Sequence, residues 1–418
     1  MKRWYVFATA VVLVVVGCGK DPVSPGAPPR ITALPRALTA QEQQIIQADN
    51  RFAIKLLKET YQDSRDTLPN LFVSPLSVAM ALGMTYNGAA TTTEAAMRST
   101  LELDSMTLDE VNQANQSLIT LLRGLDPRVQ FEIANSIWYR LGFTVEQPFL
   151  DANRTYYDAR VQALDFTAPT AVPTINAWVN DQTHGKIKDI ISAIPDDVMM
   201  YLINAIYFKG DWTQQFDKDL TAPLPFHLQD GSTVSVPTMT YGDKATIRST
   251  WTPTAQIVDL PYGGAAFSMT ILLPHENVTV DSVLSALTLN DWNTWIAGLD
   301  STSAELYLPK FKLENNLSLV NPLAGLGMGV AFSDVADFSK INRAGGLTIT
   351  DVLHKTYVDV NEEGTEAAAV TAVVVGYVCA CEPPPIRVDR PFVFALRENL
   401  SGTILFMGVI RQPPAAAQ

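Results

Sequence analysis

The sequence predicts an α+β fold with large mixed sheets, organised as one domain. Helical periodicity is concentrated in the first half of the chain, and alternating or continuous apolar runs in the second half. No internal repeat, low-complexity block or linker follows Thr39. Hydrophobic residues make up 47% of the 418 residues, which is ample material for one core. We therefore expect a single domain over residues 40–414.

Two segments predict the first helices. Residues 40–61 carry apolar side chains at helical spacing, at Ile45, Ile46, Phe52, Leu56 and Leu57. Residues 76–84 follow Pro75, and proline is favoured in the first turn of a helix. Both segments are therefore predicted to be helical.

The strands follow from apolar runs of two kinds. Residues 129–133 and much of 306–313 alternate apolar with polar side chains, which is typical of half-buried strands. Residues 199–208 are almost continuously apolar around Asn204, which predicts a strand covered on both faces. Further strands are predicted at residues 268–274, 392–396 and 403–410.

The N-terminus has the pattern of an export signal. Two basic residues precede an apolar run from 4 to 16, which is shorter than the roughly 20 residues that a spanning helix needs. The run ends in Val-Val-Gly before Cys18 and resembles the bacterial lipobox, where cleavage leaves a lipid-modified N-terminal cysteine. We expect residues 1–17 to be a lipoprotein signal peptide and Cys18 to be lipidated, with an uncleaved anchor as the alternative.

The next segment is predicted to be a tether to a membrane. Residues 18–39 are rich in Pro, Gly, Ser and Ala, a composition typical of a semi-extended linker. Gly19 after the cysteine resembles the outer-membrane sorting pattern. The expected location is therefore lipid-anchored on a bacterial cell membrane, the outer one if there are two, or extracellular.

Net charge and cysteine content limit which partners, crosslinks and metals the protein is expected to have. A formal net charge of −13 argues against a nucleic-acid partner, which would call for a basic patch. Lipidation of Cys18 leaves two cysteines, Cys379 and Cys381, so the exported domain has no disulfide framework. No histidine lies near them in sequence, and no metal is expected. We expect accessible thiols at a loop tip.

Signatures of catalysis are lacking in the sequence. The chain has four histidines and no Gly-x-Ser-x-Gly motif. His275-Glu276 is not followed by the second histidine of a zinc-protease helix. The protein is therefore predicted not to be an enzyme, and no cofactor is expected.

Residues 361–381 are locally undecided between loop and strand. An acidic start and Gly364 are followed by alanine, which tolerates helix, and by threonine and valine, which prefer a strand. Apart from Glu366, residues 365–375 are small or β-branched and could enter a tightly packed sheet. The segment is either an ordinary edge strand or one that switches between exposed loop and strand.

Eight separated motifs, in order along residues 40–413, together resemble the serpin family. They are NLFVSPLS at 70–77, INAWV at 175–179, THGKI at 183–187, LINAIYFKGDW at 202–212, LPKF at 308–311, LGM at 326–328, ADF at 336–338 and RPFVF at 390–394. The resemblance implies the serpin fold, with three β-sheets, eight or nine helices and an exposed reactive-centre loop.

The resemblance gives residues 361–381 a function. The segment is similar to the hinge of inhibitory serpins at Glu362, Gly364, Thr365, Glu366, Ala367, Ala368 and Ala369. In such proteins a protease cleaves the loop, and the hinge side inserts into the main sheet as a new strand. This implies a suicide-substrate inhibitor, a monomer whose partner is a serine endopeptidase held as a covalent acyl-enzyme. The alternatives are inhibition of cysteine proteases and a non-inhibitory serpin that acts as a binding or scaffold protein.

The family spacing also predicts the bond that is cleaved. Counting from Gly364 places it between Val378 and Cys379, whereas counting back from residues 391–392 lands two residues later. Tyr377, Ala380 and Cys381 are therefore kept as alternatives. All are apolar, aromatic or thiol-bearing, which favours a subtilisin-, chymotrypsin- or elastase-like target.

Further positions match the family's machinery for opening the main sheet. Four match the group called the shutter, namely Ser74, Ser77, Asn204 and His354. A buried amide needs partners, and the resemblance implies that the shutter supplies those of Asn204. Trp212 matches the tryptophan of the region called the breach, and Lys310 is expected to pair with Glu362 at the top of the sheet.

Overall fold

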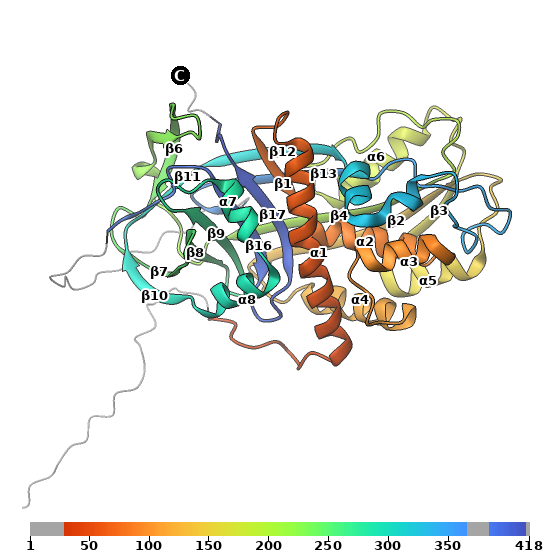
Figure 1. Ribbon diagram of the computed structural model, residues 1–418, viewed down its shortest axis with the longest axis horizontal. Helices are drawn as coiled ribbons and strands as arrows, with labels where there is room; N and C mark the ends of the chain where they lie inside the picture. Colours follow the sequence, from red (N-terminus) through yellow and green to blue (C-terminus); the bar gives the residue numbers. More distant parts are fainter. Residues whose placement is uncertain (1–28, 366–383, 415–418) are drawn as a thin grey trace, which may run out of the picture.

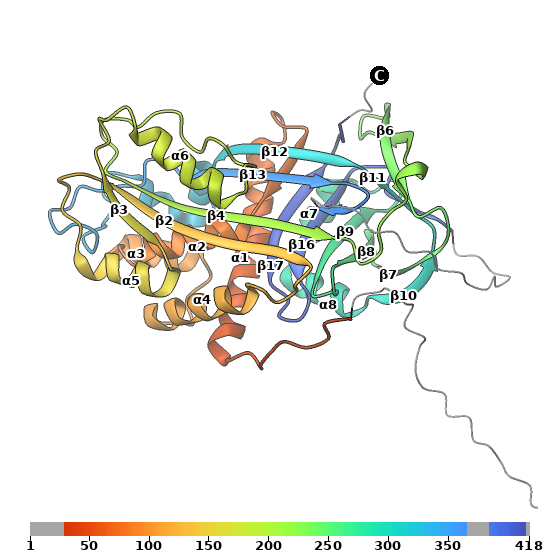
Figure 2. The ribbon, with the colours of Figure 1, turned by 180° about the vertical axis from the view of Figure 1, so that it is seen from behind.

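Three β-sheets and nine α-helices make up the part of the chain that the computed structural model describes, residues 29–365 and 384–414 (Figures 1 and 2). The predicted α+β class and the three-sheet arrangement are confirmed. The predicted signal peptide (residues 1–17), the lipidation site Cys18 and the first part of the tether lie outside the described residues.

The main sheet is six-stranded and contains the candidate site. Its strand order is β12 (Phe311–Ser318), β13 (Leu353–Val360), β14 (Gly364–Thr365), β4 (Met200–Asp211), β2 (Val129–Arg140) and β3 (Arg160–Leu164). β2 and β4 form a long antiparallel ladder in which Asn135 lies opposite Asn204. Along β13, buried residues alternate with more exposed ones, as expected of a strand with one covered face.

Two further sheets complete the body. The seven-stranded sheet has the order β1 (Asn70–Val73), β17 (Ile404–Ile410), β16 (Phe392–Glu398), β9 (Phe267–Pro274), β8 (Ala255–Tyr262), β7 (Ala245–Trp251) and β10 (Asp300–Ala304). The four-stranded sheet has the order β15 (Ile386–Arg387), β11 (Leu306–Pro309), β6 (Thr233–Thr240) and β5 (Ala222–His227). Every residue of β9, β16 and β17 is buried, so these strands form the centre of the core.

Helices pack on both faces of the main sheet, and others pack on the seven-stranded sheet. They are α1 (Ala40–Ser64), α2 (Pro75–Tyr86), α3 (Thr91–Thr100), α4 (Leu108–Leu122), α5 (Gln147–Tyr157), α6 (Ala171–Gln182), α7 (Val280–Ala286), α8 (Leu289–Ala297) and α9 (Val320–Leu323). α6 packs on β2 and β4 from the side seen in Figure 2, while α2 contacts β4 from the other side and also contacts β17. None of the helices in the described residues is both long and apolar enough to cross a bilayer.

Most predicted elements occur where expected, and one boundary is wrong. Residues 40–61 and 76–84 lie in α1 and α2, and both helices begin at a side-chain cap, from Thr39 and Ser74 respectively. The alternating run at 306–313 is divided between two sheets at Lys310, because β11 pairs with β6 while β12 pairs with β13. Local alternation cannot distinguish one strand from two consecutive strands with different partners.

A buried ion pair connects the strands of the seven-stranded sheet. The Arg397 guanidinium donates to Asp259 Oδ1 at 2.9 Å and to Thr270 Oγ1 at 2.8 Å. Thr270 in turn donates to the same carboxylate oxygen at 2.7 Å. Arg397 and Asp259 are 2% and 1% exposed, and Asp259 also pairs with Arg248 at 3.3 Å, so the buried Arg397 charge is compensated by Asp259.

Removing the carboxylate charge should therefore destabilise the protein strongly. Asp259→Asn is expected to lower the free energy of unfolding by about 3–5 kcal/mol, because it leaves the Arg397 charge buried without a counter-ion. Urea unfolding followed by tryptophan fluorescence measures this change. The control is Asp151→Asn, since Asp151 pairs with Arg154 on the surface at 3.3 Å and should contribute about 0–1 kcal/mol. Equal unfolding midpoints for the two variants would contradict the assignment.

Candidate functional site

The candidate site is an incomplete strand position in the main sheet, here called the slot. β14 occupies only its first two residues, where Thr365 lies opposite Val360 of β13 and Gly210 of β4. Within the described residues, no hydrogen-bonded ladder joins β4 directly to β13. Residues 200–209 of β4, about 33 Å of strand, therefore face β13 without pairing to it.

A cavity of about 790 Å³ extends along the slot. Its walls come from β4, from β13, from α2 beneath the sheet and from the segment that precedes β4. Thr365 lines it, as do Asn204 and His354. The sheet thus contains both the flanking strands and the space for one more strand.

The predicted shutter residues Ser74, Ser77 and His354 lie together at the start of α2. The Ser74 amide donates to His354 Nε2 at 2.9 Å, and the Ser74 hydroxyl donates to the Leu405 carbonyl at 2.9 Å. The same hydroxyl accepts from the Ser77 amide at 3.3 Å and so caps the helix. These contacts connect α2 to β13 and β17. Burial lowers the pKa of His354 to about 4, so the ring is neutral at pH 7 and its proton lies on Nδ1.

Asn204, the fourth predicted shutter residue, has a different partner. Its Nδ2 donates to Asn135 Oδ1 at 2.7 Å, while its Oδ1 is buried without a hydrogen-bond partner. The expectation that the other shutter residues satisfy this amide is wrong, because the hydrogen bonds of Ser74, Ser77 and His354 join them to one another and to Leu405, whereas Asn204 bonds to Asn135. Asn135 was not among the predicted site residues, although it too is an amide within an apolar strand.

The breach forms around Trp212 at the end of β4. The Trp212 indole donates to the Asn361 carbonyl at 2.9 Å, and its backbone amide donates to the Glu363 carbonyl at 2.9 Å. The ring stacks on Tyr262 with centroids 4.3 Å apart. Trp212 therefore contacts the chain just before the slot, on the hinge side.

The expected pair of Lys310 and Glu362 is present beside it. Lys310 Nζ donates to Glu362 Oε2 at 2.8 Å, and Thr221 Oγ1 donates to Oε1 at 2.8 Å. Burial of the Glu362 carboxyl raises its pKa, but the hydrogen bonds and the Lys310 charge outweigh burial, and the pKa of Glu362 is lowered overall. The carboxylate is ionised at neutral pH and fixes residue 362 on the four-stranded side of the breach.

The described part of the hinge enters the slot at Gly364. A Cβ at this position would overlap the carbonyl of Gly210, so the close approach of the two strands requires glycine. Thr365 is 2% exposed, and its hydroxyl lies 2.8 Å from the hydroxyl of Tyr262. Tyr262 is a further contact that the sequence did not indicate.

Other predicted site residues lie outside the described residues. They are the rest of the hinge (Glu366, Ala367, Ala368 and Ala369) and the reactive-bond candidates Tyr377, Val378, Cys379, Ala380 and Cys381. Among the residues that are described, no three His, Cys, Asp or Glu side chains form a group that could hold a metal ion.

Comparison with known proteins identifies the family. A family model described as "Serpin (serine protease inhibitor)" matches residues 47–413. The chain belongs to the serpin family. Serpins bind target proteases and are in general protease inhibitors rather than enzymes.

Individual serpins are similar over nearly the whole chain. Iripin-8 from Ixodes ricinus is 35% identical over 394 residues, which cover 89% of this chain and 94% of the relative. The leukocyte elastase inhibitor of Bos taurus is 34% identical over 381 residues, which cover 89% of this chain and all of the relative.

Solved serpin structures share the fold. Native tengpin, a thermophilic serpin, has a TM-score of 0.80 at 30% identity, covering 92% of this chain and 96% of its own. Human thyroxine-binding globulin has a TM-score of 0.81 at 27% identity, covering 90% of this chain and all of its own. The fold is thus shared with a thermophilic serpin and with a thyroxine-binding globulin.

The buried His354 predicts a pH dependence of stability. Its pKa is about 4 in the folded protein and 6.5 in an unfolded chain. Between these values the unfolded chain binds a proton at this residue that the native state does not, so the contribution of His354 to stability should fall as the pH drops from 6.5 to about 4. The loss amounts to about 3 kcal/mol, since each pKa unit corresponds to ~1.4 kcal/mol.

Urea unfolding across this pH range tests the assignment. Relative to the wild type, His354→Gln should remove the loss of stability between pH 6.5 and 5 that protonation of His354 causes. It should leave the opposite contribution of Asp49, whose burial raises its pKa to about 7. His227→Gln, the same change at an exposed histidine, should leave the pH dependence as in the wild type. A pH profile that is identical in both variants would show that His354 does not determine it.

Proposed function

We propose that this serpin is a suicide-substrate inhibitor of serine endopeptidases with apolar specificity. The proposal rests on the slot, because Gly364 and Thr365 already pair with β4, Thr365 also pairs with β13, and a cavity between described residues of these strands continues beyond them. The residues that follow in sequence are small or β-branched up to Val375, apart from Glu366. They suit a strand packed on both sides.

The proposed chemistry begins as ordinary proteolysis. The hydroxyl of the protease serine adds to the carbonyl of Val378, and the peptide bond to Cys379 breaks. The proton of the hydroxyl passes through the protease base to the departing amine of Cys379, which leaves Val378 as an ester on the protease. The hinge side is then separated from Cys379 and carries the esterified protease at its new C-terminal end.

Insertion of the freed segment then competes with hydrolysis of the ester. Roughly 15 residues at about 3.3 Å each make a strand of about 50 Å. Its backbone hydrogen bonds, at about 1 kcal/mol net each, total on the order of 10 kcal/mol. This is enough to carry the esterified protease along the sheet and disturb its active-site geometry, to which catalysis is highly sensitive.

The target class follows from the candidate reactive residues. Each residue from 377 to 381 is apolar, aromatic or a cysteine, and the first basic residue after them is Arg387. The leukocyte elastase inhibitor among the relatives is named for a protease of the apolar-specific kind. A subtilisin-, chymotrypsin- or elastase-like protease is therefore the proposed partner, with a trypsin-like protease as the negative comparison.

Challenge with purified proteases tests this proposal. Subtilisin, chymotrypsin or elastase should yield a complex that survives SDS, because the ester bond persists when the protease is distorted. Mass spectrometry of the released C-terminal fragment should find Cys379 as its first residue. Cleavage by every protease without any complex would contradict inhibition, and would support a binding role of the kind that thyroxine-binding globulin is named for.

Variants at Thr365 provide the matched control. Thr365→Arg should convert the inhibitor into a substrate, because a charged side chain would replace one that is 2% exposed in the slot. Thr365→Ser keeps the hydroxyl beside Tyr262 and should keep the complex. Loop cleavage should raise the melting temperature of the Ser variant and not that of the Arg variant. An SDS-stable complex with both variants would contradict insertion at this position.

We further propose that the protein is exported and anchored by a lipid on Cys18. The proposal is supported by the lipobox-like pattern and by the short apolar run before it. Several acyl chains would hold the chain firmly, since each buried CH₂ contributes about 0.8 kcal/mol of membrane affinity.

Fractionation of bacteria that express the full chain tests the anchor. Cys18→Ser should move the protein from the membrane to the soluble fraction, because the acceptor of the lipid is lost. Cys379→Ser makes the same change in the loop and should leave the protein on the membrane. A membrane-bound Cys18→Ser variant would overturn lipid attachment at this residue.

A further inference from the structure

Residues 29–38, here called the N-terminal strap, lie on the domain between the start of α1 and the breach. Figure 1 shows this segment in red along the lower edge of the molecule, below α8. It was predicted to belong to a tether, yet Ile31 and Leu38 pack against the main core. Two sets of contacts fix its two ends.

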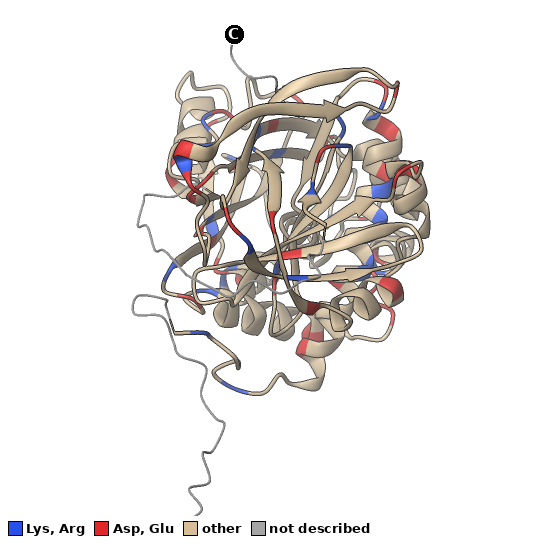
Figure 3. Ribbon diagram, turned by 90° about the vertical axis from the view of Figure 1, so that its left-hand side faces the viewer, with Lys and Arg blue, Asp and Glu red and all other residues tan. Residues whose placement is uncertain are grey.

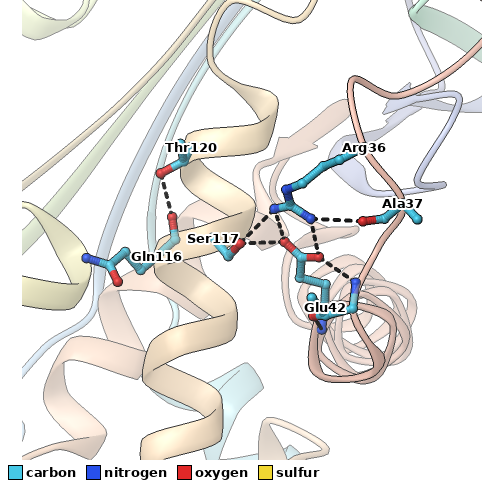
Figure 4. A network of polar contacts seen from close by, with 7 residues as sticks. Arg36, Ala37, Glu42, Gln116, Ser117 and Thr120 are labelled. Carbon is cyan, nitrogen blue, oxygen red and sulfur yellow. Dashed lines mark hydrogen bonds and ion pairs between the residues drawn. The ribbon is translucent and has the colours of Figure 1, made fainter.

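Arg36 holds the C-terminal end of the strap, next to the start of α1 (Figure 4). Its guanidinium donates to both carboxylate oxygens of Glu42, at 2.5 and 2.7 Å, and to Ser117 Oγ of α4 at 2.8 Å. Glu42 belongs to α1, and its side chain is fully buried. The hydrogen bonds from Arg36 lower the pKa of Glu42 to about 2 despite its burial, so the pair stays ionised. The strap is thereby joined to α1 and α4.

The N-terminal end of the strap packs on the turn between β8 and β9. The Ile31 amide donates to the Gly264 carbonyl at 2.7 Å. A Cβ on Gly264 would lie 3.0 Å from the Pro29 carbonyl and 3.1 Å from the Ile31 side chain, so the strap approaches this turn closely. The Gly264 amide donates to Asp126 Oδ2 at 2.7 Å, and Asp126 is buried in the linker between α4 and β2.

The same turn contacts the breach. The Gly263 amide donates to the Asp211 carbonyl at the end of β4 at 2.8 Å, and the Gly263 carbonyl accepts from Thr213 Oγ1 at 2.9 Å. The preceding residue, Tyr262, stacks on Trp212 and contacts the hydroxyl of Thr365. A continuous set of contacts therefore runs from Ile31 to the first residues in the slot.

We propose that the N-terminal strap restrains the breach and so slows spontaneous entry of the uncleaved loop into the slot. Further insertion requires the end of β4 and the residues around Tyr262 to move relative to β13. The strap holds the turn at residues 263–264 that contacts both. Contacts present in the native state but absent from the transition state slow its conversion. This inference rests on the proposed function, since it assumes that the loop can insert.

A charged residue at the packed position 31 tests whether the strap slows entry of the uncleaved loop into the slot. Ile31→Asp in the full chain should speed the conversion of the native protein on mild heating to a form that no longer inhibits and melts at a higher temperature. The expected change is about tenfold in half-life, the factor that ~1.4 kcal/mol gives. Thr32→Asp adds the same charge at an exposed neighbour and should leave the half-life within about twofold, as expected for a surface change.

Hydrogen exchange reports whether the strap has undocked. Exchange at the amide of residue 31 should be fast in Ile31→Asp and slow in Thr32→Asp. If the amide of residue 31 still exchanges slowly in Ile31→Asp, the strap is displaced instead with Gly264→Val. This variant places a branched side chain at the contact with the Pro29 carbonyl. An undocked strap with an unchanged half-life would overturn the proposal.

The failure of loop insertion itself gives a different result. If cleavage of the wild-type loop fails to raise its melting temperature, insertion and with it the proposed function are wrong. If the wild type gains stability on cleavage but the undocked variant converts at the wild-type rate, only the role of the strap is wrong.

Discussion

The missing ladder between β4 and β13 is the constraint on which the rest of the structure depends. Two neighbouring strands of a sheet ordinarily satisfy each other's backbone groups, because unpaired amides and carbonyls cost free energy when they are buried. In the part of the chain that the structure describes, the two strands are joined only through β14, which supplies two residues at one end. Completing the sheet requires a further strand, and the segment that follows Thr365 in sequence is attached at the entrance.

The contacts around the slot hold its two ends in different ways. At the start of α2, the Ser74 amide donates a hydrogen bond to His354, and this bond holds β13 against the helix. At the breach, Trp212 and Tyr262 stack beside Thr365, and the salt bridge from Lys310 to Glu362 fixes the chain before the hinge. The proposed insertion would move residues of the breach, to which the N-terminal strap is connected through the turn at residues 263–264.

Much of the fold and part of the site could be predicted from local sequence. Periodicity located α1 and α2, and apolar runs located β4, β9, β16 and β17, because burial imposes these patterns on any amphipathic helix or buried strand. The division of residues 306–313 between two sheets could not be predicted. The two strands have partners far away in sequence, and a change of partner leaves no mark on local alternation.

The sequence by itself determined the composition of residues 362–375, the apolar run before Cys18 and the ordered motifs of a serpin. Only the tertiary structure decided that β4 and β13 stand apart, that Asn204 bonds to Asn135, and that Ile31 docks on Gly264 beside the breach. The physical reason is that the local sequence pattern indicates which residues are buried and whether they favour a helix or a strand. It does not record which distant backbone or side chain satisfies that residue once the chain has folded.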